Sequence, residues 1–175
     1  MSLDESRNDR YCIISGEEGK EKIVSMVRAA DIGRLALFDE KYPYIIPMNH
    51  VFHDDTLILH GSFRGKKTEL MKQNGYASYE VDICKENLEE KKLSCHLEYE
   101  SVIVYGEITP IEDKDERRRF MQIMMDEYGR GMLKHGEEDR CYIFLFRIHK
   151  GSARDGRFMP TQNNTLYLYT FSEAD

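Results

Sequence analysis

Short apolar segments separated by polar turns run through the first half of the chain. Residues 34–38 are apolar and stop at the charged residues 39–41, as expected of a strand. Residues 44–52 and 56–63 form two more apolar segments, and the His53-Asp54-Asp55 sequence between them is typical of a tight reversal. The pattern therefore predicts one strand followed by a β-hairpin.

Two nearby segments carry apolar residues at helical spacing. Residues 17–30 form the first, and Ser15 and Glu18 at its start have the spacing of a capping box. Residues 65–73 form the second, and Asn74-Gly75 after it favours a helix end with left-handed backbone geometry. Both segments are predicted to be helices.

A third helix is predicted after Asp113 and Glu116, which also have capping-box spacing. Gly129-Arg130-Gly131 ends it. Its apolar face is rich in methionine, and we interpret this stripe as core packing rather than as a cofactor site. The face consists of Phe120, Met121, Met124, Met125 and Tyr128.

The remaining apolar segments are strand-like. Residues 76–83, 101–111 and 141–148 each predict a strand, whereas the charged residues 85–92 predict a solvated loop. Residues 164–171 add either a terminal strand or an arm that packs on a partner. Six strand-like segments with few, short helices predict a mainly β fold, a six-stranded antiparallel barrel with helices packed outside it. Periodicity alone does not distinguish a closed barrel from a sandwich.

Length and composition favour one globular unit. The 175 residues are 41% hydrophobic and 33% charged, which is enough apolar material for one core. We expect an N-terminal extension at residues 1–16, a domain at residues 17–150 and a C-terminal arm at residues 151–175 that packs on a dimer partner. No apolar run approaches the roughly 20 residues that span a bilayer, and the first residues are polar. We therefore expect a cytoplasmic protein without a membrane partner.

The chain is acidic overall, with a formal net charge of −7. This charge repels phosphate polymers, so nucleic acid is not an expected partner. The four cysteines are dispersed without a Cys-x-x-Cys pair, so the sequence predicts neither a metal site nor a disulfide framework. An anionic ligand would need a local cluster of cations, and Arg64-Gly65-Lys66-Lys67 is one.

His60-Gly61-Ser62 lies directly before this cluster. Gly61 permits close approach to the main chain, and the Ser62 hydroxyl can bind an anion. The helix that follows offers unpaired N–H groups and a partial positive charge, so the segment predicts a phosphate site. A P-loop does not fit, because His60 stands where its first glycine is required and Lys67 where Ser or Thr is required. The alternative is that Lys66 and Lys67 are solvated lysines at a helix entry.

Pro47 lies inside the apolar segment 44–52. Proline cannot donate to a ladder, so this strand must be an edge, bulged, or turned toward a ligand at that point. A planar ring with hydrogen-bonding edges could use the main-chain groups left free there.

Four collinear motifs give the chain a resemblance to a known family. It resembles the FMN-binding split-barrel proteins over about residues 20–150, and most of all the nitroimidazole-resistance (Nim) type, which is related to pyridoxamine 5′-phosphate oxidase. The motifs are Ile32-Gly33-Arg34-Leu35-Ala36, Pro43 to Asn49, His60 to Lys67 and Tyr99 to Gly106.

The resemblance implies a six-stranded split barrel that forms a homodimer with two FMN sites at the subunit interface. The residues implied to line the flavin ring are Pro47, Met48, Asn49 and His50. Those implied to flank the ring and the ribityl chain are His60, Gly61 and Ser62, and those implied at the phosphate are Arg64, Gly65, Lys66 and Lys67. Ser101 would reach the flavin from the second subunit.

The sequence departs from the family pattern in places. Gly65 replaces a serine, and His50 stands where the Nim type more often has an aromatic residue. The arginine-rich C-terminal sequence of pyridoxamine phosphate oxidases is not reproduced by Arg147, Arg154 and Arg157, so vitamin B6 chemistry is not expected.

The resemblance favours an FMN-dependent oxidoreductase that takes hydride from NADH or NADPH and reduces a small acceptor such as a nitroaromatic. In such an enzyme His60 is the candidate catalytic residue, as a proton donor or substrate contact beside the ring. The alternative is that His60 only packs against the cofactor. Two other hypotheses are a module that binds FMN or haem without turnover and a cofactor-free structural dimer.

Overall fold

The computed structural model describes residues 11–84, 99–132, 134, 136, 139, 141–156 and 164–171. The predicted loop at residues 85–92 lies outside them. The elements are β1 (Tyr11–Ser15), α1 (Glu17–Ala29), β2 (Ile32–Asp39), β3 (Tyr42–His53), β4 (Thr56–Gly61), α2 (Lys66–Gln73), β5 (Tyr76–Cys84), β6 (Tyr99–Pro110), α3 (Lys114–Glu127), β7 (Tyr142–Gly156) and β8 (Asn164–Thr170). Every predicted helix and strand is present, and β1 is an additional strand.

Six strands close into a ring in the order β7-β4-β3-β2-β5-β6, and pairing of β6 with β7 completes it. All neighbours in the ring are antiparallel. The predicted mainly β fold, a six-stranded split barrel with flanking helices, is confirmed.

The split is visible in how two strands change partners. One edge of β7 pairs with β4 along residues 142–147 and with β8 along residues 150–155. Strand β3 changes partners along its length: its residues 42–49 pair with β2, and only its residues 50–53 pair with β4. The described part of the chain therefore leaves one edge of β3 without a strand partner over residues 42–49.

The chain ends pair with each other outside the ring. β8 continues the sheet from β7, and β1 pairs with β8 in parallel. Residues 164–170 thus form a strand on their own chain, and β7 continues to Gly156, past the predicted domain boundary at residue 150.

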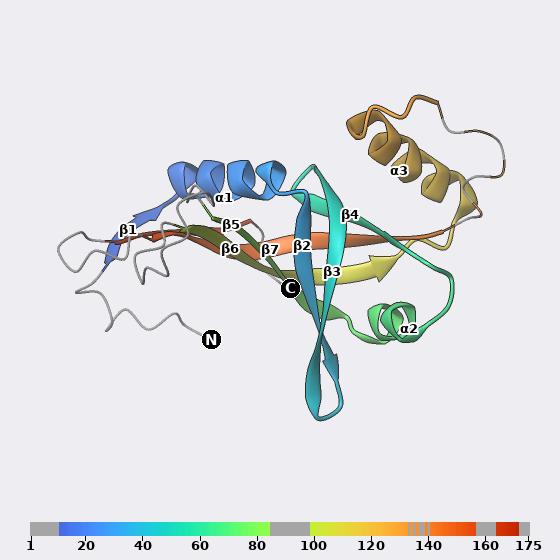
Figure 1. Cartoon of the computed structure of the whole chain (residues 1–175), viewed down its shortest axis with the longest axis horizontal. Coiled ribbons are helices and arrows are strands. Elements are labelled where there is room, and N and C mark those ends of the chain that lie inside the picture. The colour runs from blue at the N-terminus through green and yellow to red at the C-terminus, as the bar shows by residue number, and fades with distance from the viewer. Residues whose placement is uncertain are drawn as a thin grey trace, which may run out of the picture.

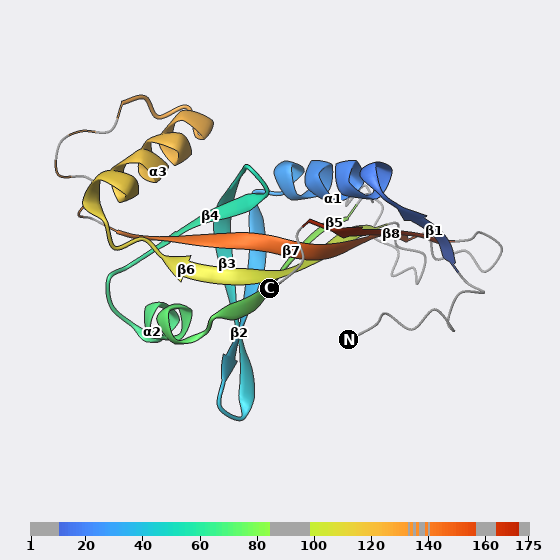
Figure 2. The ribbon, with the colours of Figure 1, turned by 180° about the vertical axis from the view of Figure 1, so that it is seen from behind.

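The three helices cover different parts of the barrel. In both views α1 and α3 lie on the same side of the strands and α2 lies on the other side, while the turn between β2 and β3 projects away from the barrel (Figures 1 and 2). None of the described helices is long and apolar enough to cross a membrane.

Two apolar clusters result from the alternation of side chains along the strands. The larger fills the barrel and the space under α1, with Leu35, Leu59, Val104 and Phe146 fully buried beside Ile23 of α1. The smaller lies under α3 and consists of Val51, Ile58, Ile111, Met124 and Ile143. Neighbouring residues of β4 therefore face different cores.

Helix and turn predictions had mixed outcomes. Asp54 and Asp55 both have positive φ, which confirms the tight reversal after β3. Glu116 N–H donates to Asp113 Oδ1 at 2.8 Å, which confirms the N-cap of α3. The capping box at Ser15 was wrong, because Ser15 ends β1 and the N-cap of α1 is Gly16. The left-handed end of α2 was also wrong, since Asn74 is extended.

Candidate functional site

The loop between β4 and α2 is shaped by its own hydrogen bonds. Thr68 Oγ1 donates to the Ser62 carbonyl at 2.6 Å, and the Ser62 hydroxyl accepts from Arg64 N–H at 3.3 Å. Gly65 is the N-cap of α2 with φ of 110°, a conformation that favours glycine, and no side chain caps the helix. The first N–H groups of α2 therefore have no N-cap side chain to accept from them.

The structure separates the two lysines of this loop. Lys67 lies beside Gly61. A Cβ atom added to Gly61 would be 3.2 Å from Lys67 Cε and 3.5 Å from Lys67 Nζ. Lys66 Nζ instead lies 2.5 Å from Asp39 Oδ2 at the end of β2, and this hydrogen bond raises the pKa of Lys66. Only Lys67 of the pair reaches the backbone of His60-Gly61-Ser62.

Pro47 and its neighbours lie on the part of β3 that pairs on one side only. Pro47 is opposite Arg34 of β2 in a regular register, and β4 pairs only with residues 50–53, so of the three predicted alternatives the structure has the edge and not the bulge. The side chains of Pro47 and Asn49 are exposed, whereas the Met48 side chain is buried in the barrel core. A planar ligand on this edge would therefore not meet the Met48 side chain.

His50 begins the part of β3 that pairs with β4, and its ring is buried. Its Nε2 lies 2.8 Å from the Val27 carbonyl, which can only accept, so Nε2 carries a hydrogen and donates it. Its Nδ1 lies 2.9 Å from the Tyr79 hydroxyl. Burial lowers the pKa of His50 despite the opposing effects of the Val27 hydrogen bond and Asp31.

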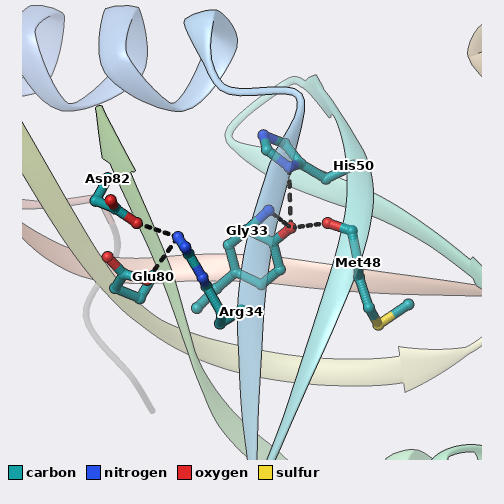
Figure 3. Close-up of polar contacts among 7 residues, drawn as sticks. Gly33, Arg34, Met48, His50, Glu80 and Asp82 are labelled. Carbon is teal, nitrogen blue, oxygen red and sulfur yellow. Dashed lines mark hydrogen bonds and ion pairs between the residues drawn. The ribbon is translucent and has the colours of Figure 1, made fainter. Parts of the chain in front are cut away.

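Tyr79, on β5, is a residue that the sequence interpretation missed. Its hydroxyl accepts from Gly33 N–H at 3.1 Å and donates to the Met48 carbonyl at 2.7 Å (Figure 3). Burial raises the pKa of this hydroxyl, so it stays protonated. The alternation of Tyr79 with Val81 along β5 placed it on the inner face, but no pattern indicated its polar partners.

Charged residues occupy the outer face next to this network. Arg34 of β2 forms ion pairs with Glu80 and Asp82 of β5 (Figure 3). Arg34 and Glu80, which directly follow Gly33 and Tyr79 in the sequence, are thus paired on the outside of the barrel.

A cavity of about 670 Å³ opens between α3 and the β3–β4 hairpin. His60 and Asn49 line it, together with Arg28 and Arg130. Partial burial, followed by the positive charges of Lys67 and Arg130, lowers the pKa of His60. His60 is therefore neutral near pH 7 and can donate one hydrogen bond and accept another.

The methionine stripe of α3 forms a wall of this cavity. Met124 is buried in the smaller core, as predicted for the stripe. Met121, Met124 and Met125 also line the cavity, so core packing describes only part of their environment. Methionine side chains adapt to irregular shapes, and such a wall suits ligands of differing outline.

Ser101 is the predicted site residue that the structure does not bring to the others. It lies on β6, opposite Asp82 of β5 and Arg154 of β7. In the ring, β6 is three strands away from β3 in either direction. Within one chain Ser101 and the Pro47–Asn49 segment are thus on opposite strands of the barrel. No group of three or more described residues of the His, Cys, Asp and Glu types could hold a metal ion.

Comparison with solved structures finds the same fold in several proteins. A candidate 5-nitroimidazole antibiotic resistance protein from Bacteroides thetaiotaomicron is 23% identical with a TM-score of 0.66, covering 77% of this chain and 82% of that one. A FAD-binding protein from Mesorhizobium loti is 21% identical with a TM-score of 0.58, covering 78% and 94%. The FAD and heme binding protein from Mycobacterium smegmatis is 16% identical with a TM-score of 0.66, covering 82% and 74%.

No curated protein matches the chain. The model of one protein family, described as pyridoxamine 5′-phosphate oxidase, matches residues 19–152. This match includes the β3 edge, the loop before α2 and the whole of α3. The chain therefore belongs to the pyridoxamine 5′-phosphate oxidase family.

Proposed function

We propose that this chain is a cytoplasmic FMN-binding oxidoreductase that uses NADH or NADPH to reduce a small planar acceptor such as a nitroaromatic. The observation that carries the proposal is the uncapped N-terminus of α2, with Lys67 beside Gly61 and the free edge of β3 nearby in the same barrel. Two of the three similar proteins are FAD-binding proteins, and the fold that this chain shares with them supports a flavin site.

The residues present fit a flavin with a terminal phosphate. Lys67, the Ser62 hydroxyl and the α2 amides would hold the phosphate, because an uncapped helix N-terminus favours an anion. Gly61 and Gly65 have no Cβ to block close approach. Main-chain groups of Pro47, Met48 and Asn49 would bind the ring. A bound flavin would accept hydride from the nicotinamide and pass electrons to the acceptor.

The cavity beside His60 is the proposed place for the acceptor. Its methionine wall takes the apolar face of a planar compound, and the neutral imidazole of His60 donates a hydrogen bond to a polar substituent. Water is excluded from one side by α3. His60 thus holds the acceptor through this hydrogen bond, and its imidazolium form, the minority form near pH 7, can supply a proton to the acceptor as it is reduced and return to the neutral form.

A second copy of the chain completes the proposed site. Pro47 and Ser101 lie on strands that one barrel keeps apart, and both strands carry exposed isoleucines, Ile45 and Ile103. We propose that the partner in a homodimer brings its own Ser101 to the flavin held by Pro47–Asn49.

The test begins with the visible spectrum of the purified protein. If the purified protein carries no flavin, added FMN or FAD should be taken up with quenching of flavin fluorescence. FMN should bind more tightly than FAD. NADH or NADPH should then be oxidised in the presence of a nitro compound. Flavin uptake without any reduction by either nucleotide would support a binding module instead.

A haem-binding module is the second candidate, because His60 offers an unprotonated ring nitrogen to a cavity of about 670 Å³. A single intense Soret band after addition of haem, without flavin uptake, would favour it. Protein that takes up neither group would favour a structural dimer.

A further inference from the structure

The Tyr79 hydroxyl stands between two strands of the barrel. Gly33 of β2 and Met48 of β3 are cross-strand partners, and the hydroxyl accepts from Gly33 N–H at 3.1 Å and donates to the Met48 carbonyl at 2.7 Å. A side chain from β5 therefore connects the backbones of β2 and β3 at this pair. Figure 3 shows Gly33, Met48 and His50 close together, and its dashed lines mark the hydrogen bonds of this network.

Glycine at position 33 makes this arrangement possible. A Cβ added there would lie 2.2 Å from Cε1 and 2.6 Å from the hydroxyl oxygen of Tyr79. Tyr79 is 1% exposed, so its ring has no other place to go. Packing of the Tyr79 ring against Gly33 therefore sets the position of the hydroxyl.

His50 offers the Tyr79 hydroxyl a second acceptor. Its Nε2–H donates to the Val27 carbonyl in the last turns of α1, so in the neutral ring Nδ1 is an acceptor. That Nδ1 lies 2.9 Å from the Tyr79 hydroxyl, whose single hydrogen faces two acceptors, Nδ1 and the Met48 carbonyl. The end of α1, the β3 backbone and Tyr79 are thus linked in one buried network.

This network lies where β3 changes partners. Asn49 is the last residue of β3 that pairs with β2, and His50 is the first that pairs with β4. The network holds the Met48 carbonyl from inside the barrel, while the outer side of Pro47 and Asn49 is exposed. Main-chain groups are useful for ligand binding only when their direction is fixed in advance.

We propose that Tyr79, held by His50, is a positioning residue that sets the direction of the Pro47–Asn49 main chain for the flavin ring. The inference rests on the proposed flavin function. It adds Tyr79 of β5 and His50 of β3 as residues that act on the flavin ring through the main chain of Pro47–Asn49.

The test is Tyr79→Phe, which keeps the packed ring and removes only the hydroxyl. Gly33 N–H and the Met48 carbonyl are then free to pair directly, so the fold is retained and the β3 backbone moves. We expect the FMN dissociation constant to rise about tenfold, and the visible circular dichroism of bound FMN to change. Tyr76→Phe is the matched control, because Tyr76 lies on β5 with its side chain 65% exposed and should bind FMN like the wild type.

His50→Gln is the second variant, and it tests the positioning role of the network if Tyr79→Phe does not fold. The Gln amide can still donate toward Val27, but it lacks the Nδ1 acceptor for Tyr79. FMN affinity should fall about threefold, as for part of one hydrogen bond.

A merely structural role gives a different result. Folded Tyr79→Phe and His50→Gln proteins would then bind FMN with wild-type affinity and wild-type circular dichroism, which would overturn the inference and leave the flavin function supported. A wild-type protein that takes up no FMN would overturn the proposed function and the inference together.

Discussion

Lys66 and Lys67 are adjacent in sequence but meet different partners. Lys66 pairs with Asp39, and its side chain lies near the Tyr44 ring, whereas Lys67 lies beside Gly61 at the start of the candidate phosphate site. We expect Lys67→Ala to weaken FMN binding about tenfold or more, because a charged hydrogen bond to the phosphate is lost. Lys66→Ala should change the affinity less than threefold.

Flavin fluorescence titration of both variants checks this prediction. Circular dichroism in the far ultraviolet serves as the control for folding. Equal losses in the two variants would show that the electrostatic field of the loop, and not the position of Lys67, binds the phosphate.

His50 predicts a pH dependence of stability. Burial lowers its pKa in the folded protein below the ordinary value of 6.5. Below pH 6.5 the unfolded chain therefore binds more protons than the folded chain, so the free energy of unfolding should be highest above this pH and fall as the pH drops below it. His60 acts in the same direction.

Urea unfolding at pH 7.5 and pH 5.5 measures this effect. The loss of stability on acidification should be smaller in His50→Gln, which has no titrating ring at this position. An identical loss in the variant and the wild type would rule out His50 as its source.

At the level of elements, the three helices begin in different ways. α3 has a side-chain N-cap, in which Asp113 Oδ1 accepts from Glu116 N–H at 2.8 Å, whereas α1 and α2 begin at glycines without a side-chain cap. α3 forms one wall of the cavity beside His60, so its N-terminal cap contributes to the shape of the site.

Asp113→Ala should lower the free energy of unfolding by about 1 kcal/mol, because the Glu116 N–H in the first turn of α3 then loses its hydrogen-bond acceptor. Ser15→Ala is the control, because Ser15 ends β1 and does not cap α1. Urea unfolding of both variants checks the difference, and a loss of similar size in Ser15→Ala would contradict the assigned cap.

At the scale of the whole molecule, exposed apolar side chains lie on the outside of the barrel on β2 and β3 and, on the opposite side of the ring, on β6. Ile45 of β3 is 63% exposed and Ile32 of β2 is 51% exposed, and Ile103 of β6 is exposed as well. Exposed apolar groups of this kind are typical of surfaces that bind another protein. A homodimer in which the β3 surface of each copy meets the β6 surface of the other would bring Ser101 of one copy toward Pro47–Asn49 of the other.

Sedimentation equilibrium should therefore give twice the mass of one chain. Ile45→Asp should shift the protein toward monomer and weaken FMN binding in parallel, because a charge would be buried in the interface. Met132→Asp is the control, since Met132 is 81% exposed after the end of α3 and away from these strands. A wild-type monomer would contradict the dimer.

The sequence by itself determined which segments become helices and strands. Apolar alternation and turn residues are local properties, so the β3–β4 hairpin, the special position of Pro47 in its strand and the helix after Asp113 could all be predicted from neighbouring residues. The cation cluster before α2 and the family resemblance likewise indicated the phosphate loop. β1 was missed because residues 1–16 were interpreted as an N-terminal extension, and its partner strand β8 lies at the other end of the chain.

Only the tertiary structure decided how distant residues meet. The Gly33–Tyr79 contact joins residues on two strands, and the Lys66–Asp39 pair separates two adjacent lysines. The cavity beside His60 forms because α3, far along the chain, covers the β3–β4 hairpin. Such contacts depend on strand register and on the path of the chain, and these are set by packing over the whole barrel rather than by any local pattern.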